Sequence, residues 1–418
     1  MQEYKEYFLS NGIKVLYFNF PFMRSTEVKM FLKGGALFEA DNQVGLSHFL
    51  EHILFAGTKK YPNRLDLTEA IKKTGGSING NTSRDAWHYP IKVTDKYIDL
   101  SFEVLAELLQ NGLIKNEDIE HEKRIITEEL QRLIDRPSEY LGWSLMPQTI
   151  FENVALKRQI EVEINNISKI TPAMVSDFYH TFYNANNMLL TVCSSQPIEN
   201  ILTKAEKNLG SIKRGLQPQQ LNETSPVLNR VIFKARDIKQ INFSFGTETF
   251  GINDSREYQS RITAHILSSL LFEKLREEKG LTYSANAFTR FYSNTGAIFS
   301  IIATDKEKII ETLQTTLECF DLLKNSISDK YFDKAKNVIL SNLLFEEEKP
   351  SPFAYNIAYQ ALYKNKVQTS KDKTNIINSI TKDDISNLSK QYFVKEKIGF
   401  SFLGNIDDKL KSEIKKLL

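Results

Sequence analysis

Cysteine is scarce in this sequence of 418 residues, which contains only Cys193 and Cys319. Both lie in apolar stretches, so we expect two buried free thiols and no disulfide framework, which suits a reducing compartment. No apolar run approaches the roughly 18 residues of a membrane span, and the first residues lack the order of a secretory signal. We therefore expect a cytoplasmic protein with no membrane partner.

An excess of either charge is also missing. The sequence has 54 Lys and Arg residues against 52 Asp and Glu residues, which leaves a formal net charge of +2, and neither sign forms a block. This balance gives no reason to expect a nucleic-acid partner. With 18 Gly, 11 Pro and 41% hydrophobic residues the composition is that of a globular protein. At roughly 150 residues per domain, the length predicts two or three domains.

The hydrophobic pattern predicts strands and helices in mixed order, with connections too varied for a regular βαβ repeat. This favours an α+β fold in which mostly antiparallel sheets are covered by helices. The predicted strands are 13–18, 27–32, 87–93, 189–193, 231–235, 241–246 and 298–303. The predicted helices are 45–56, 65–74, 96–110, 117–134, 172–182, 258–278, 306–323 and 329–347.

The middle of the chain indicates a duplication. Residues 209–226 are polar and turn-rich, which predicts a linker between domains at 1–208 and 227–418. The apolar positions from Ile167 recur from Ile377, at an offset of 377 − 167 = 210, and His52 aligns with His265 at 265 − 52 = 213. Chance register between helices is the alternative, but the aligned blocks keep their order. We therefore predict two similar domains.

The sharpest chemical signal is the segment His48-Phe-Leu-Glu51-His52. Residues at i and i+4 share a helix face, so both imidazoles can bind one zinc ion. Glu51 lies beside them, where a carboxylate can act as general base on a zinc-bound water. The alternative is that both histidines are hydrogen-bonded core residues.

The predicted helix 117–134 offers a third ligand. Glu122 and Glu129 are seven residues apart and so share a face. A surface helix rich in glutamate is the alternative reading of either residue alone.

The order His-x-x-Glu-His resembles the pitrilysin-type (M16, inverzincin) zinc metallopeptidases, and nearly the whole chain resembles their short two-domain subgroup, which includes the mitochondrial processing peptidase subunits. The resemblance implies that the third ligand is the glutamate 77 residues after His52, which is Glu129, and that Glu122 supports the site. It also implies that Gly76, Ser77 and Asn79 belong to an edge strand that binds an extended substrate. A simple hairpin turn is the alternative there.

In the second half, Arg276 and Tyr283 resemble a family pair that faces the zinc from the opposite domain and contacts the substrate. A helix-end charge and a half-buried strand residue are the alternatives. The duplication aligns Arg261, Ala264 and His265 with the three motif residues, and Ala335 and Asn342 with the two glutamates. We therefore expect no metal site in the second domain and predict that His265 is a packed core residue.

These observations predict a zinc-dependent endopeptidase with one Zn²⁺ per chain, in which Glu51 activates a zinc-bound water for attack on peptides or unfolded segments. The family encloses its substrate between two two-domain halves, so a chain of this length resembles half of a clamshell. We therefore expect a homodimer, with a heterodimer as the alternative. The competing functions are a non-catalytic or partner-dependent subunit of a heterodimeric processing peptidase, and a zinc hydrolase acting on non-peptide amides.

Overall fold

The computed structural model describes residues 4–364 and 366–418, and these form two compact units. Unit 1 comprises the chain up to Leu130 together with Glu161–Asn222 and Phe345–Leu362. Unit 2 comprises Gln131–Ile160, Glu223–Leu344 and Tyr363–Leu418. The predicted linker contains an irregular stretch at residues 213–223, and the chain passes from unit 1 to unit 2 at its end.

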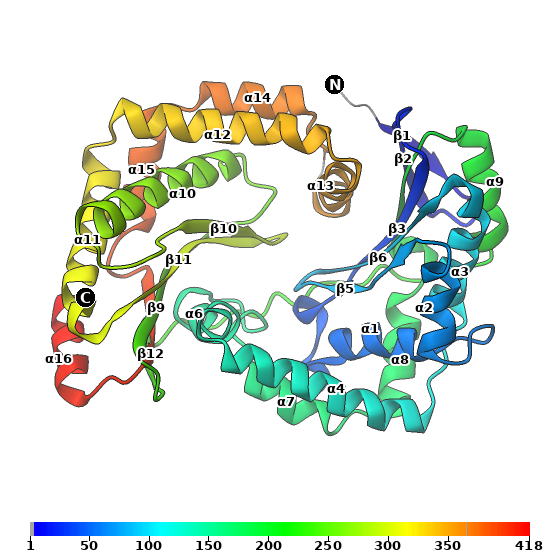
Figure 1. Ribbon diagram of the computed structural model, residues 1–418, viewed down its shortest axis with the longest axis horizontal. Helices are drawn as coiled ribbons and strands as arrows, with labels where there is room; N and C mark the ends of the chain where they lie inside the picture. The colour runs from blue at the N-terminus through cyan, green and yellow to red at the C-terminus, as the bar shows by residue number, and fades with distance from the viewer. Residues whose placement is uncertain (1–3, 365) are drawn as a thin grey trace. The chain divides into compact units, whose positions relative to one another are not determined.

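Unit 1 is built on a seven-stranded sheet in the order β1-β2-β7-β3-β6-β4, with β5 also pairing to β6 (Figure 1). Strands β2 and β7 are parallel, and the other neighbours are antiparallel. The strands are β1 (Tyr4–Phe8), β2 (Lys14–Asn19), β3 (Ser25–Lys33), β4 (Ser77–Ile78), β5 (Asn81–Thr82), β6 (Ala86–Thr94) and β7 (Met188–Ser194).

Helices cover both faces of this sheet. On one face, fully buried Trp87 of β6 packs against Phe178 and Phe182 of α8. On the other, Phe353 and Tyr355 of α13 contact aromatic rings of β2 and β3. The helices are α1 (Leu46–Ala56), α2 (Arg64–Lys72), α3 (Ile98–Gln110), α4 (Asn116–Asp135), α7 (Ile160–Ile167), α8 (Pro172–Phe182), α9 (Ile198–Leu209) and α13 (Pro350–Tyr363). Short 3₁₀ turns are η1 (Ala36–Phe38), η2 (Asp41–Gln43), η3 (Asp95–Tyr97) and η5 (Ala185–Asn187).

Unit 2 has a five-stranded sheet in the order β10-β11-β9-β12-β8, formed by β8 (Val231–Ala235), β9 (Gln240–Phe250), β10 (Ala287–Phe291), β11 (Thr295–Asp305) and β12 (Ile398–Gly404). Phenylalanines of β9 and β12 pack within its core. The helices are α5 (Pro137–Tyr140), α6 (Met146–Ile150), α10 (Glu257–Leu271), α11 (Ile309–Asn325), α12 (Asp329–Glu347), α14 (Ser370–Ser379), α15 (Lys382–Tyr392) and α16 (Asp408–Leu417). Two π-helical segments, η4 (Leu141–Leu145) and η6 (Phe272–Glu278), and the 3₁₀ turn η7 (Lys306–Lys308) complete it.

The two sheets confirm the predicted α+β class and the two similar domains. Strands β2-β7-β3-β6-β4 of unit 1 correspond in order to β8-β12-β9-β11-β10 of unit 2. In each series the first pair is parallel and the following pairs are antiparallel. Such agreement of order and direction is not expected from chance register between helices.

The residues that belong to each unit differ from the predicted domains at two segments. Residues 131–160 fall within the predicted first domain but belong to unit 2, and residues 345–362 show the converse exchange. For residues 345–362 the physical reason is α13, because its buried Phe353 and its partly buried Tyr355 pack against aromatic rings of the first sheet. Cys193 and Cys319 are buried and free, as predicted. None of the described helices is both long enough and apolar enough to span a membrane.

Candidate metal centre

Helix α1 carries the His-x-x-Glu-His segment and is fixed at its start by a buried carboxylate. Glu39 accepts hydrogen bonds from the backbone N–H groups of Gly45, at 3.0 Å, and Ser47, at 2.7 Å. These are unpaired donors at a helix N-terminus, where negative charge is favourable. Burial raises the pKa of Glu39, although the two backbone hydrogen bonds act in the opposite direction. The apolar face of α1, with Phe49, Leu50 and Ile53 fully buried, then holds the helix in the unit 1 core.

The structure brings together the three predicted ligands. The Nε2 atoms of His48 and His52 lie 3.7 Å and 3.5 Å from the same oxygen, Oε2 of Glu129 on α4. Zinc bonds of 2.0–2.2 Å in a tetrahedral arrangement place neighbouring ligand atoms about 3.4 Å apart. In the described residues this is the one group of three His, Cys, Asp or Glu side chains close enough to share a metal ion. Its spacing and its donor atoms both fit zinc.

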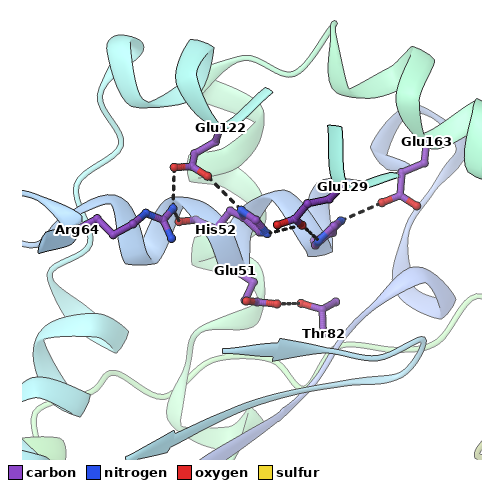
Figure 2. Close-up of polar contacts among 8 residues, drawn as sticks. Glu51, His52, Arg64, Thr82, Glu122, Glu129 and Glu163 are labelled. Atoms are coloured by element: carbon purple, nitrogen blue, oxygen red, sulfur yellow. Dashed lines mark hydrogen bonds and ion pairs between the residues drawn. The ribbon is translucent and has the colours of Figure 1, made fainter. Parts of the chain in front are cut away.

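Glu122 contacts the Nδ1 atom of His52, the ring nitrogen that does not face Glu129 (Figure 2). Its Oε2 lies 3.0 Å from Nδ1 of His52, and its Oε1 accepts a 2.6 Å hydrogen bond from Arg64 of α2. Arg64 also donates to the backbone carbonyl of His52 at 3.3 Å. Burial would raise the pKa of Glu122, but the hydrogen bond with His52 and the charge of Arg64 outweigh it and lower this pKa. Glu122 therefore remains a carboxylate able to orient the ring.

His48 has an equivalent partner, Glu163 of α7, at 3.3 Å from its Nδ1 atom. Burial would lower the pKa of His48, but the hydrogen bond and the charge of Glu163, with those of Glu51 and Glu129, raise it above its ordinary value. Sequence reasoning missed both Glu163 and Arg64. Neither has a spacing that relates it to the histidines. Only the register of the duplication, in which Glu163 aligns with Lys373, offered a hint.

Glu51 points away from His52 and Glu129 toward the edge of the sheet (Figure 2), where it accepts a 2.7 Å hydrogen bond from the hydroxyl of Thr82. Gly80 lies against the same carboxylate. A Cβ atom added at Gly80 would sit 2.7 Å from Oε1 of Glu51. Glu51 is thus beside the metal position but free of it, and it faces the edge of the sheet.

That edge is formed by the short strands β4 and β5, both paired to β6. The predicted substrate residues Gly76, Ser77 and Asn79 lie just before β4, in it and just after it. Asn79 donates its backbone N–H to the carbonyl of Pro90, and the proline has no N–H to return. This explains why the edge strand is interrupted there. Because N–H groups alternate in direction along a strand, neighbouring groups of this edge face outward, where a further strand can pair.

Arg276 and Tyr283 lie in unit 2, so the structure leaves their predicted role toward the zinc untested. Arg276 is in the π-helical segment η6, and its guanidinium stacks 5.0 Å from the ring centre of Phe272. Tyr283 is 86% exposed, which is unusual for so large a side chain. It is therefore available to a ligand or a partner.

The helices of unit 2 that correspond to α1 and α4 carry different residues at the site positions, and one prediction about them needs correction. Arg261, Ala264 and His265 lie on α10, and Ala335 and Asn342 lie on α12. The prediction that His265 is a packed core residue is wrong, because its side chain is only partly buried. Burial and the charges of Arg261 and Lys334 lower its pKa. In the described part of unit 2, no group of three potential ligands converges.

Comparison with known proteins finds peptidases and peptidase subunits. The family model described as "Insulinase (Peptidase family M16)" matches residues 14–163, and "Peptidase M16 inactive domain" matches residues 169–339. An "uncharacterized zinc protease" of Rickettsia felis is 27% identical, over 92% of this chain and 94% of its own. Mitochondrial-processing peptidase subunit beta of Lentinula edodes is 24% identical, over 96% and 90%. The crystal structure of a protease from Helicobacter pylori, 19% identical, superposes with a TM-score of 0.87 over 97% of this chain and 100% of that one.

Proposed function

This chain belongs to the M16 peptidase family, and we propose that it is a zinc-dependent endopeptidase that hydrolyses peptides or unfolded segments. The observation that carries the proposal is the convergence of His48, His52 and Glu129 within ligand distance of one another, with Glu51 beside them but uncoordinated. A structural zinc site is normally closed by four protein ligands, whereas a catalytic one has three and an open position. The set found here has the catalytic number.

In the proposed reaction, the zinc ion, Glu51, Glu122 and the sheet edge each have a separate role. Bound Zn²⁺ would lower the pKa of a coordinated water and polarise the scissile carbonyl. Glu51 accepts the proton of the attacking water and returns it to the leaving amine. Glu122 fixes the orientation of His52 through its Nδ1 atom. The free edge at β4 and β5, including Gly76, Ser77 and Asn79, pairs with the substrate main chain, which selects extended peptides over other amides.

We further propose that the active form is a homodimer in which Arg276 and Tyr283 of one chain complete the substrate site of the other. The high exposure of Tyr283 supports a role in contact with another molecule. Size-exclusion chromatography with light scattering tests this directly. A fully active monomer would refute the dimer, and activity that appears only after a second, different chain is added would establish the heterodimer instead.

The proposed chemistry is tested by Glu51→Gln. We expect the variant to retain about one equivalent of zinc and to hydrolyse a quenched peptide library 10²- to 10⁴-fold more slowly, because it lacks the general base. Glu128→Gln, on the neighbouring helix α4, is the matched control and should keep wild-type activity. Equal cleavage by Glu51→Gln and wild type would remove Glu51 from the mechanism.

A partner-dependent subunit is the second candidate function, because the family model of an inactive domain matches residues 169–339 and one relative is named as a subunit of a peptidase. This candidate predicts zinc binding without hydrolysis by the purified chain. The same peptide assay therefore separates the two candidate functions. A zinc-loaded wild-type chain that cleaves no peptide in the absence of a partner favours the partner-dependent subunit.

A further inference from the structure

We propose that Glu163 is a positioning residue of the metal centre. In this proposal Glu163 accepts a hydrogen bond from Nδ1 of His48 and so directs Nε2 of that ring toward the metal position. The inference rests on the proposed function, because it assumes that His48 is a ligand. It adds a residue that lies far from the recognised motif in the sequence and on a different helix.

The geometry of the His48 ring supports this role. Its Nε2 atom faces Glu129 at 3.7 Å, and its Nδ1 atom faces Glu163 at 3.3 Å. A neutral imidazole carries its proton on one nitrogen only, and a carboxylate at Nδ1 holds the proton there. The lone pair is then left on Nε2, which is the atom that lies beside Glu129. The contact thus selects the tautomer that can bind a metal.

The surroundings of Glu163 show that this contact is built into the fold. Its side chain is only 18% exposed, although it is a carboxylate. A Cβ atom added at Gly45 would lie 3.0 Å from Cγ of Glu163. The missing side chain at Gly45 therefore allows α7 to approach the first turn of α1. Burying a carboxylate is unfavourable unless it is paired, and the contact with His48 provides the pairing.

The two histidines are held in the same manner. Glu122 lies 3.0 Å from Nδ1 of His52, as Glu163 lies 3.3 Å from Nδ1 of His48. Each ring therefore has a carboxylate on one nitrogen and the Glu129 side chain near the other. Metal-binding histidines commonly donate their second N–H in this way, and loss of such a partner typically weakens metal binding 10- to 100-fold. If His52 needs a carboxylate at Nδ1 to orient its ring, His48 needs one as well, and Glu163 provides it.

The duplicated half provides an internal comparison. At the offset of 210 that aligns Ile167 with Ile377, Glu163 aligns with Lys373, since 373 − 163 = 210. Lys373 is buried on α14, which corresponds to α7. The half that has arginine in place of His48 thus also has a cation in place of Glu163. The histidine and its carboxylate are present together in one half and absent together in the other, as expected for residues that act as a pair.

The experiment measures zinc affinity, by competition with a chromophoric chelator, for wild type, Glu163→Gln and Glu161→Gln. Glu161 is two residues away on the same helix, where side chains point to a different face, and so provides a matched loss of charge. We expect the zinc dissociation constant of Glu163→Gln to rise 10- to 100-fold and that of Glu161→Gln to change less than threefold. The d–d absorption of the Co²⁺-substituted Glu163→Gln protein should also shift from that of wild type.

Two measurements separate this role from simple anchoring of α7. The melting temperature of each metal-free variant reports whether that variant is folded. If Glu163→Gln does not fold, Glu163→Asp supplies a folded variant, and its shorter side chain should also weaken zinc binding. Zinc affinity within threefold of wild type in the folded variants, with an unchanged Co²⁺ spectrum, overturns the proposal. The wild-type titration distinguishes this failure from failure of the proposed function, because a wild type that binds no zinc would refute the metal site itself.

Discussion

Replacing Gly80 by alanine should displace the proposed general base without touching the metal ligands. The added Cβ atom would sit 2.7 Å from Oε1 of Glu51 and 2.7 Å from the ring of Phe55, where ordinary contact begins at 3.4 Å. The overlap of 3.4 − 2.7, about 0.7 Å, must be relieved by movement of Glu51 or of the edge strand. Gly80 has no positive φ angle, so the effect comes from this contact and not from backbone strain.

The magnitude follows from the sensitivity of catalysis to position. A misplacement of roughly 1 Å at a reacting group can reduce the rate about 10²-fold. We therefore expect kcat/KM of Gly80→Ala to fall about 10- to 100-fold. If Glu51 moves, the loss is in kcat, and if the edge strand moves, KM rises as well, because the substrate pairs with that strand. Zinc content should stay at the wild-type level, since neither histidine is displaced.

The control is Gly112→Ala, whose added Cβ atom would also approach helix α1 to 2.7 Å but would meet the methyl end of Leu54. It therefore reports the cost of crowding α1 without contact to Glu51. Both variants are assayed with the same quenched peptide, with zinc content and melting temperature measured in parallel. If Gly80→Ala keeps kcat/KM within about threefold of wild type, or if Gly112→Ala loses as much activity, the reasoning is refuted.

Two further predictions concern stability. Arg64→Gln leaves the buried carboxylate of Glu122 without its cation, so urea unfolding of the metal-free protein should show a free energy of unfolding lower by about 1–2 kcal/mol. The double variant Arg64→Gln/Glu122→Gln should recover part of the lost stability. An unchanged urea midpoint for Arg64→Gln would contradict the role of Arg64 as the partner of Glu122. Burial, with a smaller effect from the charge of Lys29, lowers the pKa of His88 to about 4. The imidazole of His88 therefore binds a proton more tightly in the unfolded chain than in the folded one, so stability should fall as pH decreases from 6.5 to 4, by at most roughly 3 kcal/mol. The melting temperature of His88→Gln, measured against pH, should lack this decrease.

Local sequence patterns were sufficient for the pairing of His48 with His52 and for much of the fold, whereas the choice of Glu129 over Glu122 as the third predicted ligand came from the family resemblance. His48 and His52 are fixed relative to one another by one turn of a helix, and every strand and helix that was predicted is present within a few residues. The helix predicted at 258–278 is divided, because its last part is the π-helical segment η6.

Several of the elements that escaped prediction depend on long-range contacts. Strands β4 and β5 are two residues each and exist only through pairing with β6. Strand β12 is interrupted in its pattern by Gly399, where a Cβ atom would lie 2.3 Å from the carbonyl of Thr149. Helix α13 begins with prolines, which normally indicate a turn, and its aromatic face is explained only by the sheet of unit 1. Glu163 and Arg64 also reach the site through packing between helices, and apart from the register of the duplication at Glu163, the sequences of these helices give no indication of it.

In unit 2 an ion cluster lies at the helix position that corresponds to the candidate metal centre of unit 1. On α10, the carboxylate of Glu257 is only 4% exposed and is paired with Arg261 at 2.7 Å and Lys364 at 2.6 Å. Burial would raise the pKa of Glu257, but these two cations lower it, so the buried group remains ionised. Arg261 occupies the position that corresponds to His48. A histidine at this position would remove one of the two cations paired with this buried carboxylate, and because Lys364 would remain, we expect a cost of about 1–3 kcal/mol. The same helix position therefore belongs to an ion cluster in unit 2 and to the candidate metal centre in unit 1, and we expect Arg261→His to destabilise unit 2.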